Sequence, residues 1–274
     1  YMLNSVKSSA KLKGRVEQTK FYILARDFSK AIRRTKNKPP VALARRGVSA
    51  YKQLPNKQRK NTENKTIAIQ MRALADTDPA KVIEAIDAIE KGGKLSLAAR
   101  QGMLWARMKC LERLGSDEVL LAFLRQLGDG GLEGWQLEQV YPAVKSRKDV
   151  NIRLAAAQEL LPKLTTEPTM ERRFKIVLIE AMLELEQYPE AYEQAQAFRD
   201  AYPKAGDAYR LVALAAAKTD RPIQADKAWR IITDRADPRR EIWWEGMLNR
   251  IEIRAGSTRP KAACKVLSEI DLRI

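Results

Sequence analysis

The stretch EAYEQAQAFRDAYP, residues 190–203, returns in altered form as QADKAWRIITDRADP, residues 224–238. Ala191 and Ala225 lie 34 residues apart, and the aromatic residues Tyr209 and Trp243 keep the same spacing. A period of this length, made of two helical patterns and a turn, predicts stacked helical hairpins, because one isolated hairpin cannot bury its apolar stripe. The sequence therefore predicts an all-α protein with an α-solenoid in its C-terminal part.

The helical patterns extend upstream of this repeat. Residues 66–170 carry shorter patterns separated by turns of two to six residues, which predicts antiparallel neighbouring helices. We expect irregular α-hairpin repeats there, with HEAT-like repeats as the open alternative. The regular repeats are expected over residues 171–274.

The periodic positions of residues 171–272 resemble the tetratricopeptide repeat family. The resemblance is carried by an early aromatic, a small residue opening the second helix, a later apolar residue and a closing proline: Tyr209 and Trp243, Ala191 and Ala225, Phe198 and Ile232, Pro203 and Pro238. Ile179 and Ala213 stand where the family has glycine, so the match is partial. The resemblance implies a right-handed solenoid of antiparallel hairpins.

The same resemblance implies a ligand groove lined by the first helix of each hairpin. Projecting the register onto this chain gives five candidate residues for a partner-binding groove: Arg173, Arg210, Lys218, Trp244 and Leu248. A mixture of basic and apolar side chains suits an acidic or amphipathic peptide. The alternative is that each of them is an ordinary solvated surface residue.

The N-terminal quarter of the chain carries almost all of the net charge. Residues 1–65 hold 18 Lys and Arg against Glu17, Asp27 and Glu63, whereas the whole chain has a net charge of +17. Residues 1–36 are expected to form a basic helix packed through one apolar stripe. Residues 37–65, which include Pro39 and Pro40 near their start, are expected to be a basic linker, because a polar run buries too little surface to offset its ordering entropy.

Such a basic arm seeks an acidic surface. Its candidate contact residues are Arg33, Arg34, Lys36, Arg45, Arg46, Lys57, Arg59 and Lys60. We expect a noncatalytic scaffold that mediates protein–protein interaction in a larger assembly, with the arm docked on an acidic partner. A nucleic-acid-associated repeat protein, which would bind RNA or DNA phosphates through residues 1–65, is the alternative.

The chain contains no histidine, which argues against Ser-His-Asp and Cys-His catalysis and against most zinc, iron and copper sites. No phosphate-binding loop motif is present, and a paired-carboxylate enzyme would need two carboxylates that converge in a pocket. The expectation is therefore a protein that is not an enzyme, with no catalytic residues, metal site or cofactor.

Two features bear on the compartment. The two cysteines, Cys110 and Cys264, cannot form a disulfide framework, which favours a reducing cytoplasmic location. The chain begins with Tyr1, so export or attachment to a cell envelope after removal of a signal is the other reading. No apolar run is long enough to cross a bilayer.

Overall fold

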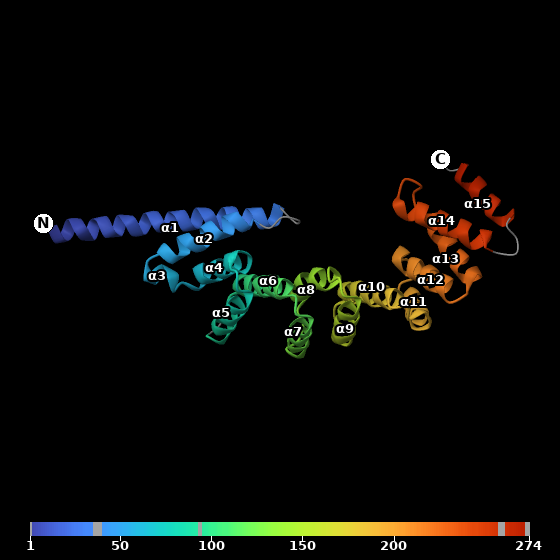
Figure 1. Cartoon of the computed structure of the whole chain (residues 1–274), viewed down its shortest axis with the longest axis horizontal. Helices are drawn as coiled ribbons and strands as arrows, with labels where there is room; N and C mark the ends of the chain where they lie inside the picture. Colours follow the sequence, from blue (N-terminus) through green and yellow to red (C-terminus); the bar gives the residue numbers. More distant parts are fainter. Residues whose placement is uncertain (1, 35–39, 93–94, 257–260, 272–274) are drawn as a thin grey trace. The chain divides into compact units, whose positions relative to one another are not determined.

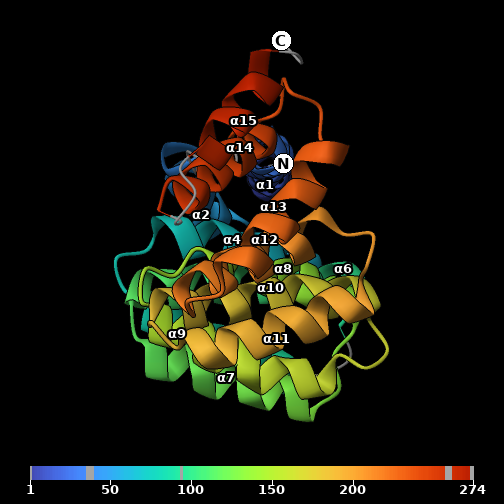
Figure 2. The ribbon, with the colours of Figure 1, turned by 90° about the vertical axis from the view of Figure 1, so that its right-hand side faces the viewer.

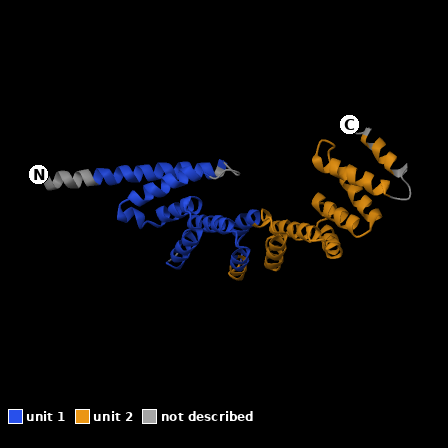
Figure 3. Cartoon of the chain, viewed as in Figure 1, with its two compact units in different colours: residues 1–123, 132–143 blue, residues 124–131, 144–274 orange. Residues whose placement is uncertain are grey.

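Every regular element is a helix in the part of the chain that the computed structural model describes, which is residues 2–34, 40–92, 95–256 and 261–271. The protein is all-α, as predicted (Figure 1). It divides into two compact units, which Figure 3 distinguishes: unit 1 is Tyr1–Phe123 with Leu132–Ala143, and unit 2 is Leu124–Gly131 with Val144–Ile274. No helix of the described ranges has the length and apolar character that a membrane span requires.

Unit 1 begins with a long helix and continues with shorter ones. Their bounds are α1 (Met2–Arg34), α2 (Val41–Gln53), α3 (Asn56–Arg59), α4 (Thr62–Ala75), α5 (Pro79–Lys91), α6 (Leu97–Leu114), α7 (Asp117–Asp129), which continues into unit 2, and α8 (Gly134–Lys145). Helix α1 packs on α2, α2 packs on α4, and α4 packs on both α5 and α6.

Helix α1 packs through the stripe that its sequence predicts. Phe21, Ala25 and Phe28 recur at helical spacing and are buried against α2 and α4. The ring of Phe28 lies edge-on to that of Trp105, with 6.5 Å between the ring centroids. Burial of a phenylalanine contributes about 1.5–3 kcal/mol to folding stability, so Phe21 and Phe28 help to hold α1 on the unit.

The prediction of a linker over residues 37–65 is wrong. The structure describes residues 40–65 of this segment, and they are mostly helical. Ala44 and Ala50 of α2 are buried in the core of unit 1. Gly47 lets α2 approach α4 closely, because a Cβ atom there would lie 2.2 Å from Sδ of Met71. Because the residues on this face of α2 are small, its backbone packs closely against α4. A prediction based on the number of large apolar residues does not detect such packing.

Hydrogen bonds order the polar end of this segment. The hydroxyl of Tyr51 donates to the carbonyl of Arg59 at 2.8 Å, and burial raises the pKa of Tyr51. Asn61 caps α4 by accepting from the backbone N–H of Asn64, whose buried side chain donates to the carbonyl of Gln58 at 3.0 Å. Polar residues thus supply the hydrogen bonds that the short helices need at their ends.

Unit 2 is a succession of helices in which each packs against the next along the chain. Their bounds are α9 (Val150–Leu160), the 3-10 turn Leu161–Lys163, α10 (Pro168–Glu184), α11 (Tyr188–Ala201), α12 (Gly206–Lys218), α13 (Pro222–Arg235), α14 (Glu241–Ala255) and α15 (Lys261–Asp271). Helix α10 also contacts α12, two elements further on (Figure 2).

The 34-residue period of the sequence is also a period of backbone geometry. Glu186 and Asp220, 34 residues apart, have φ angles of 60° and 54°. The next residue in each turn donates its N–H back to the preceding helix: Gln187 to the carbonyl of Met182, and Arg221 to that of Ala216, both at 2.9 Å. The same left-handed turn therefore joins α10 to α11 and α12 to α13.

Most of the periodic residues of unit 2 face its interior, whereas Pro203 is exposed and Pro238 is half-buried. Ala191, Ala225 and Trp243 are fully buried, and Phe198 is 1% exposed. Tyr209 is only half-buried, and its hydroxyl donates to the carbonyl of Pro203 at 3.1 Å. A small residue where the second helix of a hairpin begins allows close helix packing, which accounts for the alanines.

Candidate functional site

The basic residues expected to contact a partner are exposed on unit 1 where the structure describes them. Arg45 and Arg46 lie on α2, while Lys57, Arg59 and Lys60 lie on or just after α3. Arg34 is exposed at the end of α1. The side chain of Arg33 and all of Lys36 lie outside the described residues.

Two of these residues, Arg45 and Arg46, line a hollow between α1 and α2. The hollow has a volume of about 560 Å³, and Ile23, Leu24 and Ala50 supply its apolar lining. Neither arginine forms an ion pair with a described carboxylate. Two uncompensated guanidinium groups beside an apolar surface make this hollow suited to an acidic, partly apolar ligand.

A second hollow continues the first toward the N-terminus of α1. It also has a volume of about 560 Å³ and is lined by Lys13, Gly14 and Pro55. Glu17 and Gln53 line both hollows, so the two form one elongated depression. We call this depression, bounded by Lys13, Glu17, Lys20, Ile23 and Leu24 of α1 and Arg45, Arg46, Ala50 and Gln53 of α2, the α1–α2 groove.

One carboxylate lies among the cations of the groove. Oε1 of Glu17 lies 3.0 Å from Nζ of Lys20. The other oxygen, Oε2, is buried and has no hydrogen-bond partner among the described residues. A buried oxygen without a donor is uncommon in proteins, and a ligand would reach this one only after the side chains that cover it moved.

Sequence reasoning missed the α1 side of this groove. Lys13, Glu17, Lys20 and Leu24 recur at intervals of three and four residues, which places them on one side of the helix. That signal is present in the sequence. It does not reveal that α2 packs beside this face, because the polar composition of residues 37–65 predicts a linker there.

The five residues expected to line a groove in unit 2 have different environments. Arg173 is half-buried on α10, with Nη1 3.9 Å from Sδ of Met170. Lys218 is exposed at the end of α12, with Nζ 5.9 Å from the ring centroid of Tyr188. Trp244 and Leu248 lie one turn apart on α14 and are 39% and 57% exposed. The two apolar residues thus form a small exposed patch.

Arg210 is held by carboxylates of the protein itself. Its Nη2 lies 2.9 Å from Oε1 of Glu245 on α14, and its Nη1 lies 3.6 Å from Oε1 of Glu180 on α10. The hydrogen bond to Glu245 raises the pKa of Arg210 above its usual value. The structure therefore brings together α10, α12 and α14, the first helices of the three expected hairpins, but it uses Arg210 to connect them.

Comparison of the chain with models of protein families, with curated proteins and with solved structures finds no match.

Proposed function

We propose that this protein is a noncatalytic helical-repeat scaffold that binds an acidic protein partner through the α1–α2 groove. The observation that carries the proposal is the environment of Arg45 and Arg46. Both arginines line the groove beside apolar side chains, and neither forms an ion pair with a described carboxylate. Acidic side chains of a partner would neutralise the two guanidinium groups. Apolar side chains of the same segment would cover Ile23 and Leu24.

The shape of the groove favours a polypeptide segment. Two adjoining hollows, each about 560 Å³, extend along α1 from Lys13 to Ile23. A compact ligand would fill only one of them, whereas an extended strand or a helix would occupy both. The partner segment is therefore expected to be acidic on one side and apolar on the other.

Glu17 makes a peptide a better occupant than a nucleic acid. Its carboxylate could accept a hydrogen bond from a backbone N–H or a side-chain hydroxyl of a peptide, once the side chains that cover Oε2 move. The phosphate groups of RNA and DNA have no hydrogen-bond donor and would be repelled by the carboxylate. Binding of RNA or DNA through residues 1–65 is therefore an outcome that the experiment below must distinguish.

For unit 2 we propose a right-handed solenoid of the tetratricopeptide type as the rest of the scaffold. The turn that recurs at Glu186 and Asp220 supports a repeated hairpin. The contacts of Arg210 with Glu180 and Glu245 support alignment of three successive first helices. A concave surface on these helices would leave Trp244 and Leu248 available for a second protein contact.

The test compares two double variants of the full chain that lose the same charge. Arg45→Gln/Arg46→Gln removes the two arginines of the groove, whereas Lys57→Gln/Lys60→Gln removes two exposed cations outside it. The probe is a synthetic amphipathic peptide with Glu on one face and Leu on the other. Its Kd is measured by calorimetry at about 0.15 M salt.

The groove variant is expected to raise the Kd about tenfold, which corresponds to about 1.4 kcal/mol, and the matched control less than about threefold. Equal weakening by both variants would contradict docking in the groove. Single-stranded RNA and duplex DNA form the second arm. Tighter binding of either than of the peptide, with a steep loss of affinity as salt rises, would favour the nucleic-acid function instead.

A further inference from the structure

A pocket of unit 2, distinct from the α1–α2 groove, lies beside the first turns of α11 and the turn between α12 and α13. Its volume is about 460 Å³, within the range of small-ligand sites. The side chains that matter for its chemistry are Tyr188, Tyr192, Glu193, Gln196, Lys218 and Arg221. Two cations and two tyrosines thus border one cavity.

Both cations are positioned by aromatic rings. The guanidinium carbon of Arg221 lies 4.3 Å from the ring centroid of Tyr192, and Nζ of Lys218 lies 5.9 Å from that of Tyr188. Neither cation forms an ion pair within the described part of the chain. The ring contacts orient the two groups and leave their N–H donors without a carboxylate partner.

The hydroxyl of Tyr192 adds a third donor. This side chain is only 4% exposed, and its Oη accepts a hydrogen bond of 2.7 Å from Nε2 of Gln196. Because the oxygen is already an acceptor, its own proton is left for an acceptor in the pocket. The site therefore combines the planar guanidinium group of Arg221, the ammonium group of Lys218 and the hydroxyl donor of Tyr192.

The repeat itself does not require these residues. The turn that precedes α13 matches the one that precedes α11, yet the positions 34 residues before Lys218 and Arg221 hold Glu184 and Gln187. The positions 34 residues after Tyr188 and Tyr192 hold Pro222 and Asp226. The equivalent positions of the repeat form the same turn without this set of side chains. Folding of the hairpins therefore does not explain why these side chains converge at one turn.

We infer that this pocket binds the phosphate group of a small phosphate monoester. A phosphate monoester carries close to two negative charges and three terminal oxygens, which matches two cations and a third donor better than a carboxylate does. The cavity is larger than a phosphate group, and the remaining space would accept the organic part of the ligand beside Pro189. Glu193 at the same pocket limits the net positive charge to one.

The experiment uses the full chain and phenyl phosphate, with benzoate as the carboxylate probe and inorganic phosphate as the probe without an organic part. Kd values are measured by ligand-observed NMR for the wild type and for Lys218→Met, Arg221→Met and Glu193→Gln. Lys227→Met is the matched control, because Lys227 is exposed on α13 and does not line the pocket. Circular dichroism verifies that each variant is folded.

We expect each pocket-cation variant to weaken phenyl phosphate binding about tenfold and Glu193→Gln to strengthen it a few-fold. The Lys227→Met variant should change the Kd less than twofold, and benzoate should bind more weakly than phenyl phosphate. Equal effects of Lys227→Met and Arg221→Met would overturn the site. Tighter binding of benzoate, or no binding of phenyl phosphate at millimolar concentration, would overturn the assignment of a phosphate ligand.

Discussion

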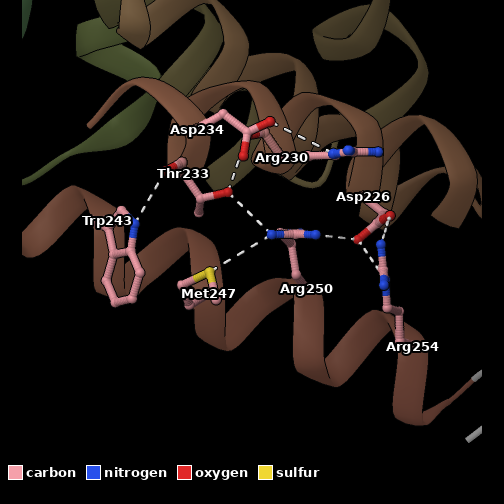
Figure 4. A network of polar contacts seen from close by, with 8 residues as sticks. All are labelled: Asp226, Arg230, Thr233, Asp234, Trp243, Met247, Arg250 and Arg254. Atoms are coloured by element: carbon pink, nitrogen blue, oxygen red, sulfur yellow. Dashed lines mark hydrogen bonds and ion pairs between the residues drawn. The ribbon is translucent and has the colours of Figure 1, made fainter. Parts of the chain in front are cut away.

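Nε of Arg250 on α14 lies 3.4 Å from Oδ1 of Asp226 on α13, and the side chain of Arg250 is only 2% exposed (Figure 4). Asp226 also accepts two hydrogen bonds from Arg254, at 3.0 and 2.8 Å. Nη1 of Arg250 donates to the hydroxyl of Thr233 at 3.1 Å. One carboxylate therefore compensates two guanidinium groups at the α13–α14 interface.

Replacing Asp226 by Asn should destabilise unit 2 by about 3 kcal/mol, because it removes a carboxylate that pairs with the buried Arg250. Urea denaturation followed by circular dichroism measures the loss. Asp200→Asn is the control, since Asp200 is an exposed residue paired only with its neighbour Arg199. A loss below about 1 kcal/mol for Asp226→Asn would contradict this prediction.

Two buried tryptophans should respond differently to substitution by Phe. Nε1 of Trp243 donates to the carbonyl of Thr233 at 3.1 Å, whereas Nε1 of Trp229 has no hydrogen-bond partner among the described residues. Both changes remove similar apolar volume, but only Trp243→Phe also removes a buried hydrogen bond. Trp243→Phe should therefore cost about 1–2 kcal/mol more than Trp229→Phe in urea denaturation. Equal losses would contradict this.

Gly246 should not tolerate a methyl group. A Cβ atom there would lie 2.7 Å from Cγ2 of Thr233, whose hydroxyl is held by hydrogen bonds to Arg230 and Arg250. Gly246→Ala is expected to cost about 1–2 kcal/mol despite the higher helix propensity of alanine. Gly256→Ala is the control, because the nearest atom to a Cβ there would be 3.6 Å away. This variant should leave the melting temperature unchanged or slightly raise it.

The two cysteines should differ in reactivity. Burial raises the pKa of Cys110 to about 11, whereas Cys264 is exposed. At pH 8 only about one Cys110 thiol in a thousand is ionised, and the thiolate is the reactive form. A disulfide reagent should therefore modify one thiol per folded chain and two in denaturant. Rapid modification of both in the folded chain would mean that α6 opens readily.

Asp76 should make unit 1 sensitive to acid. Burial opposes its ionisation, but hydrogen bonds from Arg72 and from backbone N–H groups outweigh this and lower the pKa of Asp76 below 3.8. Its contribution to stability is therefore complete above the pKa of the unfolded chain and is lost as pH falls through the lower folded-state pKa. Asp76→Asn should be less stable than the wild type at pH 6, with the difference shrinking near pH 3. A constant difference would contradict this prediction.

The sequence by itself was sufficient for the helical class and for most helix positions. The spacing of Phe21, Leu24 and Phe28 predicted the packing face of α1, and the 34-residue period predicted hairpins whose turns recur at Glu186 and Asp220. These features depend on interactions between residues close in the chain. Periodicity and turn residues record such interactions directly.

Only the tertiary structure decided which surfaces are free and which are occupied. Residues 41–53 form a helix because Gly47 and the neighbouring alanines meet Met71 of α4, and this contact creates the groove that contains Arg45 and Arg46. Arg210, expected to face a ligand, instead joins Glu180 and Glu245, while Arg221 and Tyr192 meet in a pocket that no motif marks. The availability of a side chain depends on which distant residues pack beside it, and local sequence patterns do not contain that information.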